Sequence, residues 1–423
     1  MPDGALGLAD LVRIAAATAA ITILPGLAWV WSLWPPGAEI GRAERLAWIA
    51  SLSYLIVGAV AIASARLGWL HLEPLVVSLV MVIVVGAGVS IAACRRRRAR
   101  LRFLRPSVND VVFGLAAVGL PAAILVVPQV MAVFPDGYPI GSINWYYWGL
   151  TTAIVDSGSI PATSVEWAGV YPFQGDYVLF SAYTATLPIL AGRASDFAMM
   201  EVLRLLGLAW AIVAGLAAFR RFLPRWGALV GVLLLLGSVH IASKYTGYRP
   251  EAFNYALMFM ALWAVDRFRE RMSIGRAMPV VVSIVALWIG HGVVLVVAGI
   301  LAGSVVVGHW LVGPRPTWRE VAALAALGLG GFVASTLVDV VAQGKVLLVA
   351  NALDPARIQG DEASDLTWQF LQWALGAGRL FTGNPDEAEA LWNIRILEPW
   401  TVLGGVLRWP LVLSALAPIV LWR

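Results

Sequence analysis

Uncharged stretches of about twenty residues recur through this chain and constrain its fold more than any other feature. A single α-helix crosses the hydrocarbon core of a bilayer with about 20 mostly apolar residues. Only 13% of the 423 residues are charged and 60% are hydrophobic, whereas soluble domains carry roughly 25% charged residues. A chain this poor in charge cannot cover itself with polar surface in water. The sequence therefore predicts an all-α polytopic membrane protein.

The apolar windows predict about eleven transmembrane helices. Nine of the windows are 14–34, 46–65, 74–94, 111–134, 198–219, 227–243, 250–266, 320–338 and 401–422. The window 277–314 has no Asp, Glu, Lys or Arg for 38 residues. At about 1.5 Å per residue it is too long for one crossing, so we expect two, with a break near Gly290–His291–Gly292. A single crossing is the alternative, and it would move the loop 341–400 to the other side of the membrane.

The basic residues predict an orientation. One topology places 18 of the 30 basic residues on one side, in the loops 35–45, 95–105, 220–225, 267–276 and 315–319. Cytoplasmic loops carry an excess of Lys and Arg. We therefore expect a multi-pass protein of the inner (plasma) membrane with these loops in the cytoplasm. The net charge of +5 then reflects orientation rather than nucleic-acid binding, because no soluble basic domain is present.

This topology leaves room for only one crossing between the loop 134–176, outside, and Arg220, inside. Two apolar stretches, 177–192 and 198–219, compete for it. We expect the shorter stretch, 177–192, to be an interfacial or re-entrant helix of the outer loop, since backbone at membrane depth needs cover from protein or water. The predicted organisation is three N-terminal helices and a basic loop in 1–110, a core in 111–340 with outer loop 134–197, a second outer loop in 341–400, and a last helix in 401–423.

Tryptophan marks the expected membrane–water interfaces. Its ring is apolar while its N–H can stay hydrated, so it favours the ends of spans. Seven of the 20 tryptophans lie at predicted span ends: Trp31, Trp34, Trp69, Trp226, Trp310, Trp318 and Trp400.

The first outer loop carries the main candidate for catalysis. It begins Phe134-Pro-Asp-Gly-Tyr-Pro directly after a predicted span, which holds Asp136 at the membrane surface in a turn. A carboxylate there can deprotonate an acceptor hydroxyl while a lipid-linked donor keeps its tail in the membrane. The alternative is a turn residue that caps the following helix. That helix, predicted over 143–156, starts with Trp145 and Tyr146, aromatic rings suited to stacking on a sugar.

Basic side chains in the short outer loop 243–251 are candidates for binding phosphate. Arg249, fixed before Pro250, offers a planar fork, and Lys244 offers a point charge. Lys244 could instead extend to the interface without binding a ligand. Glu251 could pair with Arg249 or simply favour the helix N-terminus.

Three further polar positions have a functional and a structural interpretation. His291, between two glycines, could contact a phosphate or be a polar residue at a turn. Asp176 could be a second carboxylate of the site. Glu201 and Arg204 lie three residues apart on one helix face, and we expect them to pair with each other.

The order of motifs resembles a known family. A span is followed by Pro135-Asp-Gly-Tyr, an aromatic-rich helix, Ser157-Gly-Ser-Ile-Pro, and Tyr171-Pro172 before an apolar helix. This order is similar to the first outer loop of the GT-C glycosyltransferases that use polyprenyl-phosphate sugars, a group that includes oligosaccharyltransferases, protein mannosyltransferases and mycobacterial arabinosyltransferases. The resemblance covers roughly residues 110–311. It implies a GT-C-like fold with Asp136 at the position of the family's catalytic Asp or Glu, and Tyr171 before the juxtamembrane helix.

The chain departs from the family at two points. Many members have His a few residues after the catalytic carboxylate, where this chain has Asn144. Many also have one span before the loop, whereas this chain has three additional spans in 1–110. The first departure weakens the interpretation that this position binds a metal ion. The substrate-binding candidates are Asn144, Trp145, Tyr146, Tyr171, Asp176, Lys244, Arg249, Glu251 and His291.

The predicted function is transfer of a sugar from a polyprenyl-phosphate donor to a cell-envelope glycan or lipid acceptor at the outer face, with Asp136 as general base. The expected partners are the bilayer, the donor, the acceptor and a further subunit, but no nucleic acid. The sequence neither requires nor excludes a divalent metal. A transporter or flippase of lipid-linked sugars and an envelope polysaccharide polymerase are the alternatives. A flippase predicts a charged path through the spans, which the first four windows lack.

Overall fold

The structure is a computed structural model, and it describes residues 7–34, 40–96, 108–123, 142–160, 163–166, 169–172, 178–192, 197–236, 248–312 and 317–343. The helices in the first half are α1 (Leu8–Thr22), α2 (Leu24–Leu33), α3 (Arg42–Arg66), α4 (Leu72–Arg96), α5 (Val108–Pro121) and α7 (Ser142–Ser157). A hairpin of β1 (Thr163–Glu166) and β2 (Gly169–Pro172) follows. The remaining helices are α8 (Val178–Ala191), α9 (Phe197–Phe219), α10 (Arg225–Leu236), α12 (Glu251–Glu270), α13 (Ile274–Val312) and α14 (Trp318–Gln343).

Five helical stretches among the described residues are long and apolar enough to cross a membrane. They are Leu8–Leu33, Arg42–Arg66, Leu72–Arg95, Met199–Phe219 and Trp318–Val338. Each overlaps most of one predicted window. The structure therefore agrees with a helical membrane protein. The predicted last span, 401–422, and the second outer loop, 341–400, lie almost wholly outside the described residues.

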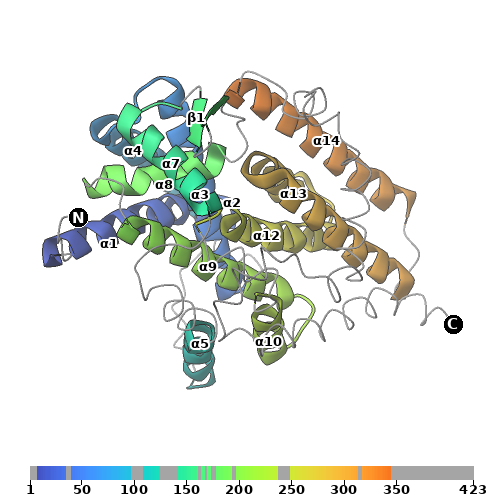
Figure 1. Ribbon diagram of the computed structural model, residues 1–423. Coiled ribbons are helices and arrows are strands. Elements are labelled where there is room, and N and C mark those ends of the chain that lie inside the picture. The colour runs from blue at the N-terminus through green and yellow to red at the C-terminus, as the bar shows by residue number, and fades with distance from the viewer. Residues whose placement is uncertain are drawn as a thin grey trace, which may run out of the picture.

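Two helices form the centre of the packed core. Helix α12 buries 15 of its 20 residues and α8 buries 12 of its 14. The buried residues lie on every face of both helices. Both are therefore core helices, because a surface helix buries only one face. Helices α3, α9 and α13 pack around them. Figure 1 shows α12 in the middle of this group, with α14 along one side and α5 beside α10 at the lower edge.

The first predicted span is interrupted once. Helix α1 ends at Thr22 and α2 begins at Leu24, with Pro25 in its first turn. Proline lacks an N–H and its ring clashes with the preceding turn of a helix, so the helix breaks here. Gly26 follows, and its N–H donates to Ser53 Oγ at 2.8 Å, which brings α2 close against α3.

Several basic loops meet at one end of the helices, which we call the basic end. There, Trp263 near the end of α12 donates to Glu44 at the start of α3 (2.8 Å). Arg221, just after α9, donates to Asp266 of α12 (2.8 Å). Four of the five loops predicted on one side contribute described residues to this end: 35–45, 220–225, 267–276 and 315–319. These parts of the four loops thus lie at one end of the packed helices, as the predicted topology requires.

Helix α13 bends sharply, because both of its ends lie at the basic end. Arg276, near its start, donates to the carbonyl of Arg267 in α12 (2.7 Å). His309, near its end, packs its ring 6.2 Å from that of Phe222, which directly follows Arg221. In a straight helix these two ends would be about 50 Å apart. The first part of α13 runs antiparallel to α12 as far as Gly290, so the bend lies beyond that residue.

The prediction that 277–314 turns back on itself at a break in the helix is therefore right in one part and wrong in the other. The chain reverses direction as predicted, but it stays helical through Gly290–His291–Gly292, so the predicted interruption of the helix there is wrong. Glycines are a common cause of sharp helix kinks. A bend can join two short limbs without a loop, which hydropathy alone does not reveal.

Helix α8 matches the stretch 177–192 that we expected not to span. Its 14 residues reach about 21 Å, less than the ~30 Å of a bilayer core. Its side chains are almost all buried by α1, α3 and α7. The interfacial alternative is therefore wrong, because such a helix would leave one face to lipid and water. A short helix covered by protein fits the re-entrant alternative.

The β-hairpin is an exception to the predicted all-α fold. β1 and β2 pair antiparallel, with Val165 opposite Val170 and Ser164 opposite Tyr171. The hairpin joins α7 to the approach to α8. The described part of the predicted outer loop thus contains this hairpin in addition to the two helices expected over 143–156 and 177–192.

Candidate functional site

The described part of the predicted outer site is built on α7, α8 and the segment before α12. Asp136, Asp176 and Lys244 lie outside the described residues. Asn144, Trp145 and Tyr146 are in the first turn of α7, which confirms the helix predicted over 143–156.

A buried hydroxyl cluster, Thr151, Thr184 and Tyr248, joins the two halves of this site. Thr151 Oγ1 of α7 lies 2.9 Å from the Tyr248 hydroxyl and 3.0 Å from Thr184 Oγ1 of α8. All three side chains are buried. Thr151 and Tyr248 are 97 residues apart in sequence, so this cluster fixes α7 against the segment that leads into α12.

Aromatic packing reinforces that contact. The ring of Tyr248 lies 5.5 Å from Trp148 of α7, edge to face, and 5.0 Å from Phe180 of α8. Burial raises the pKa of Tyr248, and its hydrogen bonds to Thr151 and Thr184 lower it by less. The Tyr248 hydroxyl is thus a hydrogen-bonding group that joins this segment to α7.

Arg249 follows directly and is the one phosphate candidate whose side chain is described. It is partly exposed, and its Nη1 lies 3.9 Å from Glu251 Oε1. Glu251 is the first residue of α12 and only 8% exposed. The two alternatives for Glu251 are thus both realised: it lies beside Arg249 and at the N-terminus of a helix, where a carboxylate is favourable. At 3.9 Å the pair is loose, which leaves the guanidinium able to bind another anion.

His291 is a residue of α13, and its side chain lies outside the described residues. Its neighbour Gly290 lies against Asn254 of α12: a Cβ at Gly290 would overlap Asn254 Oδ1 and lie 3.1 Å from Cγ. The two helices therefore approach each other closely at the end opposite the basic end. Asn254 is fully buried, and its Nδ2 donates to the Pro250 carbonyl (2.8 Å).

The predicted pair of Glu201 and Arg204 is confirmed. Arg204 donates to Glu201 Oε2 from Nε (2.9 Å) and Nη2 (2.6 Å). The Arg204 side chain is 2% exposed and that of Glu201 is 21% exposed. One turn further along α9, Gly207 lies against Phe253 of α12, so the pair lies near the start of α12 and not at the basic end. Sequence spacing predicted the pairing but not the burial of Arg204.

A network of ion pairs holds the basic end together. Arg221 donates to both Asp266 and Glu270. Burial lowers the pKa of Arg221, but these two carboxylates raise it by more, so the net shift is upward. Arg269 of α12 donates to Glu320 of α14 (3.2 Å). These bonds hold α9, α12 and α14 together where the loops enter the packed core.

The tryptophans divide into two groups. Trp69, Trp226 and Trp318 are exposed at helix ends, as expected for an interface. Trp34 is an exception, because its ring packs 4.5 Å from Trp48 and 5.9 Å from Trp263 inside the core. A span-end position alone does not distinguish a ring facing lipid from one facing a neighbouring helix.

Sequence reasoning missed Thr151, Thr184 and Asn254. A lone Thr in an apolar helix carries no signal, and the partner of Thr151 is remote in sequence. The described residues contain no group of three His, Cys, Asp or Glu that could hold a metal ion. No family model, no curated protein and no solved structure matches the chain.

Proposed function

We propose that this protein is an integral membrane glycosyltransferase that uses a polyprenyl-phosphate sugar as donor and a cell-envelope glycan or lipid as acceptor. The observation that supports it best is the bond between Thr151 and Tyr248. It ties the helix that follows the loop of Asp136 to the segment that carries Lys244 and Arg249. A base and two phosphate-binding cations on these segments would lie on neighbouring parts of the fold.

In this proposal Asp136 accepts the proton of the acceptor hydroxyl. The acceptor oxygen forms a bond to the anomeric carbon of the donor sugar as the bond from that carbon to the phosphate oxygen breaks. The configuration inverts, and the polyprenyl phosphate leaves with the electron pair of the broken bond. Arg249 and Lys244 stabilise the charge on that phosphate.

The remaining candidates line the sugar and the lipid in this scheme. Trp145 and Tyr146 form a wall for the sugar ring, and Asn144 and Tyr171 add hydrogen-bonding groups. Asp176 is a second carboxylate, and His291 is a further phosphate contact. The partial exposure of Arg249, with Glu251 at 3.9 Å, supports its role, because an anion can replace a loose contact.

The proposed orientation follows from the basic end. We place it in the cytoplasm, because Lys and Arg are retained there. The loop with Asp136, α7 and the hairpin then faces the outer side of the inner membrane. Polyprenyl-phosphate sugars presented at that face would need no soluble nucleotide.

The proposal is tested with purified protein, a polyprenyl-phosphate sugar and an acceptor extract. We expect Asp136→Asn to reduce transfer at least a hundredfold, the lower range for loss of a general base. Asp156→Asn is the matched control, because Asp156 is exposed at the far end of α7. Undiminished transfer by a well-folded Asp136→Asn protein would refute the proposal.

A flippase of lipid-linked sugars is the second candidate, and one observation favours it. The buried Arg204 pairs with the partly exposed Glu201 inside an apolar helix, and ionisable residues within spans often mark transport paths. Movement of the donor across proteoliposomes with its sugar intact would support it. A polymerase would instead give products of many sugar units.

A further inference from the structure

The basic end carries more positive charge than its ion pairs neutralise. Within residues 40–45, 220–225, 266–276 and 317–320 there are ten arginines and four acidic residues. Asp266 and Glu270 bind Arg221, and Glu320 binds Arg269. The excess lies where the helices meet the loops, at the level of lipid headgroups if these helices span a bilayer.

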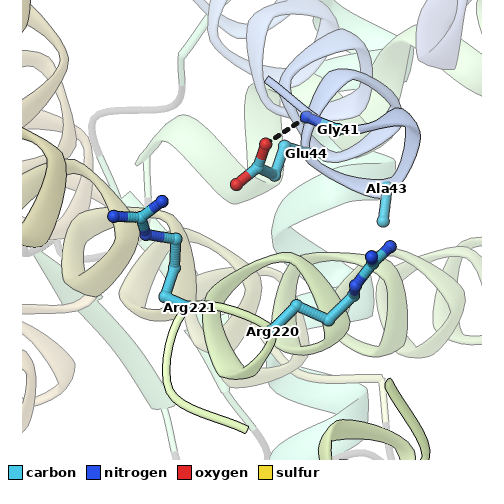
Figure 2. Close-up of a pocket in the computed structure, with 5 residues that line it drawn as sticks. All are labelled: Gly41, Ala43, Glu44, Arg220 and Arg221. Carbon is cyan, nitrogen blue, oxygen red and sulfur yellow. Dashed lines mark hydrogen bonds between the residues drawn. The ribbon is translucent and has the colours of Figure 1, made fainter. Parts of the chain in front are cut away.

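A cavity of about 200 Å³ opens in this end, lined by Gly41, Ala43, Glu44, Arg220 and Arg221. Its volume is several times the ~30 Å³ share of a liquid water molecule. Figure 2 shows the cavity between the start of α3 and the end of α9, with the guanidinium of Arg220 directed toward Ala43 and that of Arg221 directed away from it.

The charged groups in the wall differ in what they already bind. Glu44 accepts hydrogen bonds on both oxygens, from the Gly41 N–H and from Trp263 Nε1. Arg221 is turned toward Asp266 and Glu270. Arg220 is exposed, and its guanidinium makes no hydrogen bond or ion pair with the described residues. Arg220 is therefore the cation of this wall that is available to an outside anion.

Exposed apolar side chains lie close in sequence to the cavity residues. Leu46, Phe222 and Leu223 are 58%, 41% and 42% exposed, and each is within three residues of a cavity residue. A soluble anion would contact only the arginine, whereas a lipid can place its phosphate at the arginine and its acyl chains against the apolar side chains. Basic pockets between transmembrane helices bind lipid headgroups for this reason.

We propose that this cavity binds the phosphate of an anionic phospholipid headgroup, with Arg220 as its contact. The site is separate from the proposed glycosyl-transfer site, at the other end of the helices, and does not depend on that activity. Binding there would add a fixed lipid beside the ion-pair network that holds α9, α12 and α14 together.

The test is lipid retention by the purified full chain. Protein in a mild detergent is incubated with equal amounts of phosphatidylglycerol, phosphatidylethanolamine and phosphatidylcholine, and bound lipid is counted by native mass spectrometry. We expect phosphatidylglycerol to be retained preferentially, and Arg220→Gln to lower that retention about fivefold, the effect of one arginine near an anionic lipid. Arg271→Gln, an exposed arginine outside the cavity, should change it little.

Three outcomes would overturn the proposal. Equal losses in Arg220→Gln and Arg271→Gln would show a diffuse effect of net charge. Preferential binding of phosphatidylethanolamine that Glu44→Gln abolishes would assign the site to a zwitterionic headgroup. Displacement of phosphatidylglycerol by millimolar inorganic phosphate would assign it to a free anion. Thermal unfolding of each variant without added lipid confirms that the substitution leaves the fold intact.

Discussion

Gly290→Ala tests the close approach of α12 and α13 that follows from the bend. Alanine normally stabilises a helix relative to glycine by about 1 kcal/mol. At Gly290 the added methyl group would overlap the buried Asn254 side chain, with Cγ at 3.1 Å and Nδ2 at 3.2 Å. Overpacking of this kind costs about 1–3 kcal/mol. We expect the free energy of unfolding to fall by up to about 2 kcal/mol after the helix gain of ~1 kcal/mol is subtracted.

The control is Gly299→Ala in the same helix, where a Cβ would meet nothing within 4 Å. It should be neutral or stabilising by up to about 1 kcal/mol. Asn254→Ala should rescue Gly290→Ala, because it removes the side chain that the methyl group overlaps. Equilibrium unfolding in mixed micelles titrated with SDS gives the four free energies of this double-mutant cycle. Equal effects at Gly290 and Gly299, or no coupling with Asn254, would refute the helix arrangement.

Three further predictions concern other contacts. Tyr248→Phe removes one of the three hydrogen-bond partners of the buried Thr151 hydroxyl and should lower the free energy of unfolding by about 0.5–1.5 kcal/mol, measured by the same SDS titration. Gly26→Ala would place a methyl group 2.7 Å from a backbone carbonyl carbon of α3, so we expect a loss of about 3 kcal/mol, near the upper end for overpacking; an unchanged midpoint would contradict that contact. Partial burial raises the pKa of Glu270, but the bond from Arg221 and nearby arginines lower it by more, to below its ordinary value. A carboxyl group with a lowered pKa stabilises the folded state above its unfolded-state pKa, and this stabilisation is lost as pH falls through its folded-state pKa. The difference in unfolding temperature between wild type and Glu270→Gln should therefore shrink as the pH is lowered through the acidic range where Glu270 is protonated. A difference that does not depend on pH would contradict this prediction.

Much of the helical framework could be predicted from the sequence, because uncharged windows report directly on the cost of placing charge in a bilayer. Each of the five long apolar helices overlaps most of one predicted window. The common side of four basic loops could be predicted as well, since retention of Arg in the cytoplasm acts on whole loops. The pair of Glu201 and Arg204 followed from helix spacing alone.

Contacts between distant segments could not be predicted in the same way. Thr151 meets Tyr248 across 97 residues, and no local pattern selects either side chain. Helix α8 has the composition of a short span, and only its packing against three other helices distinguishes a re-entrant helix from an interfacial one. Trp34 faces the core for the same reason.

The hairpin was missed although its sequence carried a signal. Thr163-Ser-Val-Glu and Gly169-Val-Tyr-Pro contain β-branched and aromatic residues, which strands favour. Each run has only four residues, too few to outweigh the helical neighbours α7 and α8. The bend of α13 was partly foreseen from its length, but a helix that bends without a loop leaves no break in hydropathy.

The central claim is tested most directly by measuring whether the bond between the donor sugar and its phosphate is broken. Purified protein in proteoliposomes is given a radiolabelled polyprenyl-phosphate sugar together with acceptor extract, and free polyprenyl phosphate is measured alongside labelled product. A glycosyltransferase releases polyprenyl phosphate in step with product, only when acceptor is present, and loses both in Asp136→Asn. Passage of the intact lipid-linked sugar across the membrane without release of polyprenyl phosphate would contradict the account.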